Sequence, residues 1–125
     1  MNTISKFKIT TPIRAILKSD ERLTSLVGDK IVPVVASKDT PGDFIIYRRD
    51  EYSREYNKMG VHSEVCHVYI NAISEDYDRS KEIAFLIDDI LSGFHKDPKM
   101  EIKMIDSTED FEDGKYIQVL LFEVE

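Results

Sequence analysis

The chain has 125 residues, of which 42% are hydrophobic and 10% aromatic, a composition typical of one folded domain with its own core. Its 17 basic and 24 acidic residues give a net charge of -7, which argues against nucleic acid or an anionic membrane as a partner bound through charge alone. No apolar run approaches the roughly 20 residues that span a bilayer, residues 1–12 lack the apolar core of a secretory signal, and the single cysteine fits a reducing compartment. We therefore expect a single domain over 1–125 that has no membrane partner.

The first predicted element is helical and lies within residues 10–30. Thr11 is placed to cap it, Pro12 suits its first position, and Gly28 suits its C-terminal end. Asp20 can cap a second helix, so the segment is either one bent helix or two short ones. The apolar positions that recur at helical spacing are Ile13, Ile16, Leu17, Leu23, Leu26 and Val27.

Three strands are expected next, over residues 30–36, 44–49 and 65–73. Pro33 cannot donate a ladder hydrogen bond, which places the first of these strands at an edge or a strand end. The polar, tyrosine-rich tract of residues 50–63 joins the other two strands. It is longer than an ordinary hairpin connection and predicts a hairpin arm.

The clearest helix is predicted over residues 74–94, with Ser74 or Asp76 as its cap and an apolar stripe at Ile83, Ile87, Ile90, Leu91 and Phe94. A strand over residues 100–105, an acidic loop over 106–115 and a final strand over 116–125 follow. The order is α-β-β-β-α-β-β. This order predicts an α+β fold, a mostly antiparallel β-sheet with two main helices packed on one face.

Residues 62–80 hold two histidines, the only cysteine and several carboxylates. On a strand, Cys66 shares a face with Val68, Ile70 and Ala72, whereas His67 points the other way, so the two cannot form a nucleophilic pair. His62 and His67 also face apart on an unbroken strand, and no zinc-ligand spacing is present. We predict that the stretch is scaffold, with no catalytic, cofactor-binding or metal-binding residue.

Two charged segments remain. The carboxylates Glu109, Asp110, Glu112 and Asp113 lack the spacing of a calcium loop and are interpreted as solvated. Basic and aromatic residues alternate through the arm, where they either stack bases, remain exposed or contact a protein. The acidic balance of the chain favours a protein partner, bound by Arg48, Arg49, Tyr52, Arg54, Tyr56, Lys58 and Met59.

Ordered phrases run through the chain: "LTSLVGDKIVP" from Leu23 to Pro33, "TPGDFIIY" from Thr40 to Tyr47, and a helix opened by an acidic turn from Tyr77 to Leu91. In this order the chain resembles the tail-completion, or tail-terminator, proteins of long-tailed bacteriophages and prophages. The resemblance covers roughly residues 12–124. Residues 1–11 precede the usual start as an N-terminal extension, and the acidic loop over 106–115 is another departure.

The resemblance implies a non-enzymatic virion protein at the head-proximal end of the tail, assembled in the host cytoplasm. It would form a homo-oligomeric ring, usually a hexamer, that caps the tail tube protein, stops tube polymerisation and offers a face to head-completion or neck proteins. About six copies would carry a charge on the order of -42, and acids such as Glu109, Asp110, Glu112 and Asp113 in the lumen would let DNA pass without binding. A head–tail joining ring protein and, from another class, a small enzyme or metal-binding protein using the histidines remain alternatives.

Overall fold

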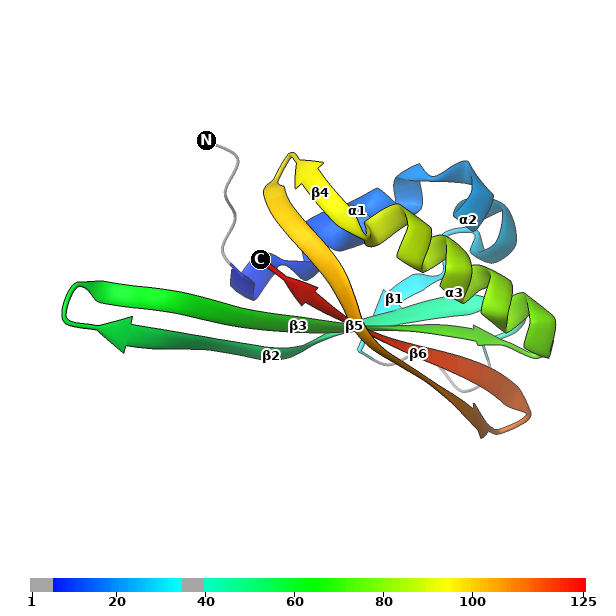
Figure 1. Ribbon diagram of the computed structural model, residues 1–125. Helices are drawn as coiled ribbons and strands as arrows, with labels where there is room; N and C mark the ends of the chain where they lie inside the picture. The colour runs from blue at the N-terminus through cyan, green and yellow to red at the C-terminus, as the bar shows by residue number, and fades with distance from the viewer. Residues whose placement is uncertain (1–5, 35–39) are drawn as a thin grey trace.

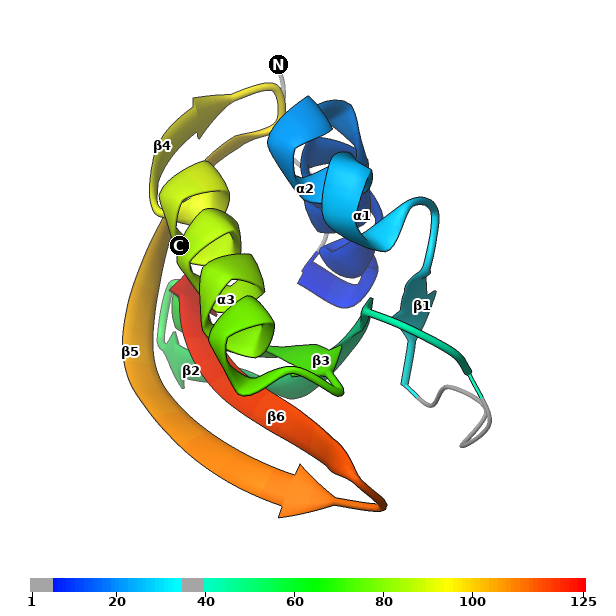
Figure 2. The same ribbon diagram turned by 90° about the vertical axis from the view of Figure 1, so that its right-hand side faces the viewer.

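A computed structural model describes residues 6–34 and 40–125 of the chain. They form a six-stranded sheet in the order β1-β2-β3-β6-β5-β4, and the helices cover one face of it (Figures 1 and 2). The β1–β2 pair is parallel and the other pairs are antiparallel. The predicted α+β class is confirmed. The elements are a 3-10 turn Lys6–Lys8, α1 Thr10–Ser19, α2 Glu21–Val27, β1 Ile31–Pro33, β2 Phe44–Asn57, β3 Gly60–Ser74, α3 Tyr77–Leu91, β4 Gly93–Lys96, β5 Lys99–Glu112 and β6 Lys115–Val124.

The N-terminal helical segment is two short helices, divided at Asp20. The Asp20 side chain accepts a hydrogen bond from the backbone N–H of Arg22 at 2.9 Å, so it caps α2 as a new helix. The predicted Thr11 cap is wrong, because α1 begins at Thr10, two residues before the predicted first position at Pro12, and Ile9 occupies the cap position without a side-chain hydrogen bond. Pro12 still lies in the first turn, where its missing N–H would have no helical partner.

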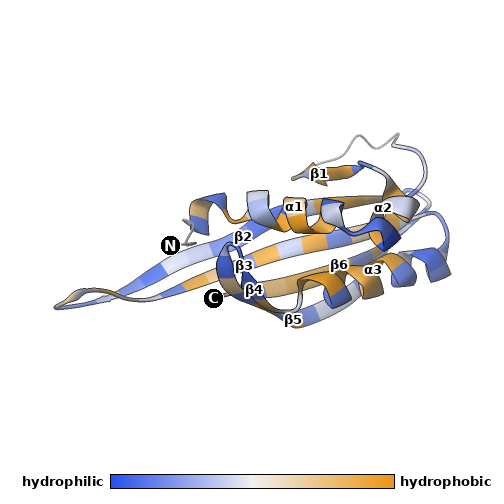
Figure 3. Ribbon diagram, turned by 90° about the horizontal axis from the view of Figure 1, so that it is seen from above, coloured by the Kyte–Doolittle hydropathy of each residue, from blue (hydrophilic) through white to orange (hydrophobic). Residues whose placement is uncertain are grey.

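The core lies between the helices and the sheet face that they cover. Every second residue of each central strand points into it, and Figure 3 shows the apolar stretches of α1, α3 and the strands beneath them. Ile9, close to the N-terminus, is also fully buried, whereas residues 1–5 of the expected extension and residues 35–39 of the predicted strand and turn lie outside the described residues. The largest fully buried side chains are Phe122, Ile9, Ile13, Leu17, Leu23, Ile31, Ile45, Ile70, Ile83, Ile87, Leu91 and Ile102.

The acidic segment predicted as a loop over 106–115 is instead a β-hairpin. β5 continues to Glu112, Asp113 and Gly114 turn with positive φ values of 53° and 77°, and β6 starts at Lys115. The sequence does not show this part of β5 as a strand, because its exposed residues are mostly polar. A bulge at Ile105 also shifts which residues point to each face of the sheet. β4 is a second strand that the sequence did not predict. It contains Phe94, which the sequence placed on the apolar stripe of the helix, and Phe94 exposes 83% of its surface.

Hydrogen bonds join the start of α3 to β2 and β3. Of the two predicted caps, Asp76 is the one that caps α3 and accepts from the N–H of Arg79 at 3.3 Å; Ser74 ends β3, and its hydroxyl accepts from the N–H of Asp76 at 3.0 Å. Ser74 also donates to the buried Asp43 carboxylate at 2.7 Å, and an Arg79 Nη1 lies 3.4 Å from that carboxylate. These contacts fix the direction of α3 over the sheet.

Candidate assembly surfaces

The arm, residues 50–63, belongs to a β-hairpin that extends beyond the rest of the sheet (Figure 1). β3 pairs with β6 only between Ser74 and His67. Residues 60–66 therefore pair with β2 alone and, at ~3.3 Å per residue, form a two-stranded ribbon that projects roughly 20 Å past the sheet. The turn at its end consists of Lys58 and Met59, between the paired residues Asn57 and Gly60.

Aromatic contacts hold the root of the arm. The ring of Phe7 lies edge-on to that of Tyr52, with 4.9 Å between centroids, and the guanidinium of Arg49 lies 4.9 Å from the Phe7 centroid. Further out, Arg54 donates to the Tyr52 hydroxyl at 2.6 Å and 2.9 Å and lies 3.4 Å from Glu64. These hydrogen bonds raise the pKa of Arg54, so its charge is fixed. The root is thus packed and hydrogen-bonded.

The tip of the arm, Tyr56 to Val61, is not packed. Tyr56, Met59 and Val61 expose 67%, 94% and 53% of their surface, and Lys58 is exposed as well. A two-stranded ribbon has no core of its own to cover such side chains. The structure therefore divides the residues predicted for partner binding into a root with Arg49, Tyr52 and Arg54, and a tip with Tyr56, Lys58 and Met59.

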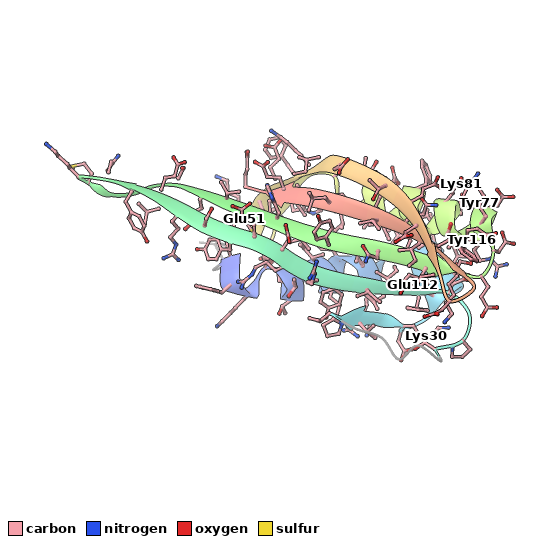
Figure 4. All side chains as sticks on the ribbon, turned by 90° about the horizontal axis from the view of Figure 1, so that it is seen from below. Lys30, Glu51, Tyr77, Lys81, Glu112 and Tyr116 are labelled. Carbon is pink, nitrogen blue, oxygen red and sulfur yellow. The ribbon has the colours of Figure 1, made fainter. Side chains whose placement is uncertain are left out.

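Arg48 alternates with the buried Tyr47 on β2, so it belongs to a different surface, the sheet face that the helices leave uncovered. Figure 4 views the molecule from that side. Its guanidinium lies over the ring of Tyr69, 5.5 Å from the centroid. The two side chains border a hollow of about 440 Å³, which is also lined by Val34, Ile46, Asp50, Asn71 and Val119. Sequence reasoning did not single out this hollow, although the half-buried apolar residues at alternate positions of β3 and β6 indicate a second contact face.

His67 and Cys66 of β3 lie on opposite faces of the sheet, as predicted. Cys66 is fully buried, and burial raises the pKa of its thiol. On the uncovered face, His67 lies between two carboxylates, with Nδ1 3.4 Å from Glu51 and Nε2 3.6 Å from Glu123. In the parts of the chain that the structure describes, which exclude the side chain of His62, no three His, Cys, Asp or Glu residues form a group that could hold a metal ion.

The acidic residues of the β5–β6 hairpin point to two different sides. Glu109 faces the helices, where its carboxylate accepts from the Gln118 amide at 2.7 Å; this bond and one from Tyr77 lower the pKa of Glu109. Gln118 also donates to Ser80 of α3 at 3.2 Å, so the hairpin is tied to the helix. Asp110 and Glu112 point to the opposite face from Glu109, the face that the helices leave uncovered. Figure 4 labels Glu112 in a view from that side.

An aromatic cluster that sequence reasoning missed lies beside Glu109. We call it the aromatic patch, and it consists of Tyr77, Phe111 and Tyr116. The Tyr116 centroid lies 5.3 Å from that of Tyr77 and 4.8 Å from that of Phe111. Tyr77 and Phe111 expose 41% and 56% of their surface, and Lys81 Nζ lies 4.5 Å from the Tyr77 centroid (Figure 4). The cluster was not predictable because Phe111 was assigned to a loop.

None of the described helices is long and apolar enough to cross a membrane. No protein-family model matches the chain, and no curated protein sequence does. Among solved structures, the chain is similar to one from the structure titled "Virion of native gene transfer agent (GTA) particle". The TM-score is 0.73 at 17% sequence identity, and the match covers 90% of this chain and 89% of that one. The two chains share a fold over nearly their whole lengths.

Proposed function

We propose that this chain is a structural virion protein of the tail-terminator type, which forms a ring that caps the tail tube. The observation that carries the proposal is the fold shared over 90% of the chain with a chain of a gene transfer agent virion. The phrases from Leu23 to Pro33 and from Thr40 to Tyr47, which resemble those of tail terminators, support the finer assignment.

The distribution of exposed apolar groups supports a role in assembly rather than catalysis. Most of the exposed large hydrophobic residues lie at the arm tip, on the aromatic patch and along the outer part of β5; the others are Phe7, Val34, Phe85 and Phe94. Exposed apolar groups of this kind mark surfaces that bind other proteins. In the proposed ring, usually a hexamer, they would contact neighbouring copies, the tail tube protein and the head-completion or neck proteins.

The acidic β5–β6 hairpin supports a passage for DNA through the ring. All four carboxylates are exposed, but Glu109 faces the helices and is bonded to Gln118, so Asp110, Glu112 and Asp113 are the ones that would face a lumen and repel phosphate. Changing these three to Asn or Gln is expected to slow DNA ejection from assembled particles. An unchanged rate of DNA ejection would contradict the proposal that the hairpin lines the lumen.

The central experiment shortens the arm and keeps the contact of Tyr52 with Phe7 at its root. Replacing residues 54–64 with Asn-Gly connects Ser53 to Val65, which already pair, and keeps Tyr52 against Phe7. We expect a folded protein by circular dichroism that no longer forms rings in electron micrographs and no longer stops tube growth. Lys18→Ala, an exposed change on α1, serves as the control and should leave both activities intact.

The result also separates the two ring assignments. A terminator binds the end of a purified tail tube, whereas a head–tail joining ring binds the portal side and leaves tubes to grow. Rings and capped tubes formed by the shortened variant would contradict the assembly role of the arm. Failure of the unaltered protein to bind tubes at all would contradict the terminator assignment.

A further inference from the structure

The arm tip and the aromatic patch lie at opposite ends of the sheet. β3 runs from the tip at Gly60 to Ser74, and Ser74 pairs with Tyr116 of the patch. At ~3.3 Å per residue, this strand separates the two surfaces by on the order of 45 Å. The tip therefore cannot reach the patch of its own chain, and a contact between the two surfaces must join different copies.

The patch has the chemistry of a site for a cationic, flexible apolar side chain. Aromatic faces attract ammonium groups and thioether sulfur, and Lys81 already lies over Tyr77 in this way. Two carboxylates border the patch: Glu109 is hydrogen-bonded to Tyr77, and Asp78 lies 3.2 Å from Lys81 Nζ.

The tip carries the complementary groups. Lys58 has no ion-pair partner among the described residues and sits next to Met59, the most exposed of the large hydrophobic residues that the structure describes, at 94%. Tyr56 and Val61 flank them. The tip thus offers one positive charge and a polarisable thioether on a narrow ribbon, where the patch offers three rings and the neighbouring carboxylates of Asp78 and Glu109.

We propose that the arm tip of one copy docks on the aromatic patch of the next copy, with Lys58 near the carboxylates and Met59 against Phe111 and Tyr116. Different surfaces meet in this contact, so it is heterologous and can close a ring. This contact rests on the proposed function, because a ring of identical copies makes a second copy, rather than the tube protein, the occupant of the patch.

Cysteine pairs test the contact directly. Samples of Met59→Cys and Phe111→Cys, mixed under mild oxidation, should give a disulfide-linked dimer, and a chain with both changes should give a ladder of linked multimers. Phe94→Cys is the matched control: it replaces another exposed phenylalanine, at 83%, outside the patch, and should not link to Met59→Cys. The native Cys66 is fully buried and does not interfere.

Charge exchange gives a second, independent test. Lys58→Glu or Asp78→Lys alone should weaken self-association by about 2–5-fold, the range for an exposed charge pair, and the double variant should restore it. Phe111→Ala should weaken it by about 10-fold, as removal of an aromatic anchor does. Sedimentation velocity measures these changes.

The outcomes separate this proposal from the terminator assignment when both tests are run on the free protein and on capped tubes. Rings or capped tubes without the Met59–Phe111 link and without the charge rescue would overturn the docking proposal alone. A link from Met59→Cys only to the tube protein would overturn it too and assign the tip to that partner. Linked multimers that never cap tubes would support the docking and overturn the terminator assignment.

Discussion

Asp43 shows how a single carboxylate positions a whole helix. It is 5% exposed, at the start of β2, and its Oδ1 accepts from Ser74 at the end of β3. Arg79, in the first turn of α3, lies 3.4 Å from the other oxygen. Three elements meet at this one side chain, and a buried carboxylate is tolerated in the core only with such partners.

Asp43→Ala is expected to lower the free energy of unfolding by about 2 kcal/mol, because the Ser74 hydroxyl loses its buried acceptor. The melting temperature should fall by roughly 5–10 °C in calorimetry. Asp43→Asn keeps an acceptor for Ser74 and should lose less. Asp106→Ala, which removes an exposed carboxylate of β5, should change stability by no more than ~0.5 kcal/mol. Equal effects of the Asp43→Ala and Asp106→Ala changes would contradict the role given to the buried contact.

At the scale of the element, the outer edge of β5 is open. β4 pairs with β5 only from Lys99 to Ile102, so within residues 6–34 and 40–125 no strand neighbours the outer edge from Lys103 to Glu112. Met104, Ile105 and Phe111 are exposed along it. Open edges with exposed apolar groups invite pairing with other chains, and charged residues oppose that pairing. The acids interspersed along this strand thus have a protective effect in addition to any role in the lumen.

Neutralising these acids should therefore make the protein aggregate. The variant Asp106→Asn, Asp110→Asn, Glu112→Gln is expected to scatter light sooner and more strongly than the unaltered protein at equal concentration. Its control makes the same change in net charge on the helical side of the molecule, as Glu21→Gln, Asp29→Asn, Glu82→Gln. Similar aggregation of both variants would show that net charge, rather than the edge, determines solubility.

The sequence predicted the elements that contribute to the core and missed those that do not. α3 and the inner half of β3 were predictable because burial on one face imposes a helical or alternating pattern, as Ile83, Ile87 and Cys66 show. The outer part of β5 and the whole of β4 were missed because they contribute no buried residue to the core and lack such a pattern. The aromatic patch depends on the β5–β6 pairing that sets Phe111 beside Tyr116, and pairing between strands is not encoded in local spacing.

At the scale of the whole molecule, association is a balance between net charge and local contact. Each copy carries -7, so copies repel one another when ions are few and the Debye length is about 30 Å, as at 0.01 M salt. At about 0.15 M this length falls to ~8 Å, which screens the general repulsion but preserves contacts at short range.

We therefore expect self-association to strengthen between 0.01 M and 0.15 M salt, as measured by sedimentation velocity at fixed protein concentration. Self-association of the Lys58→Gln variant should be weaker at each salt concentration but should strengthen with salt in the same way. This variant keeps the general repulsion between copies and loses only the Lys58 contact with the patch. A steady weakening of association over this range would show that attraction between opposite charges governs the assembly instead.

The placement of the arm tip and the aromatic patch at opposite ends of β3 gives each molecule a direction. Copies joined tip to patch all point the same way around a closed circle, and no two-fold axis then exchanges its upper and lower surfaces. Such a circle has two unlike sides from the outset. In the proposed ring, one side would bind the tail tube and the other would bind the head-completion or neck proteins. The order in which these partners attach would then need no additional adaptor.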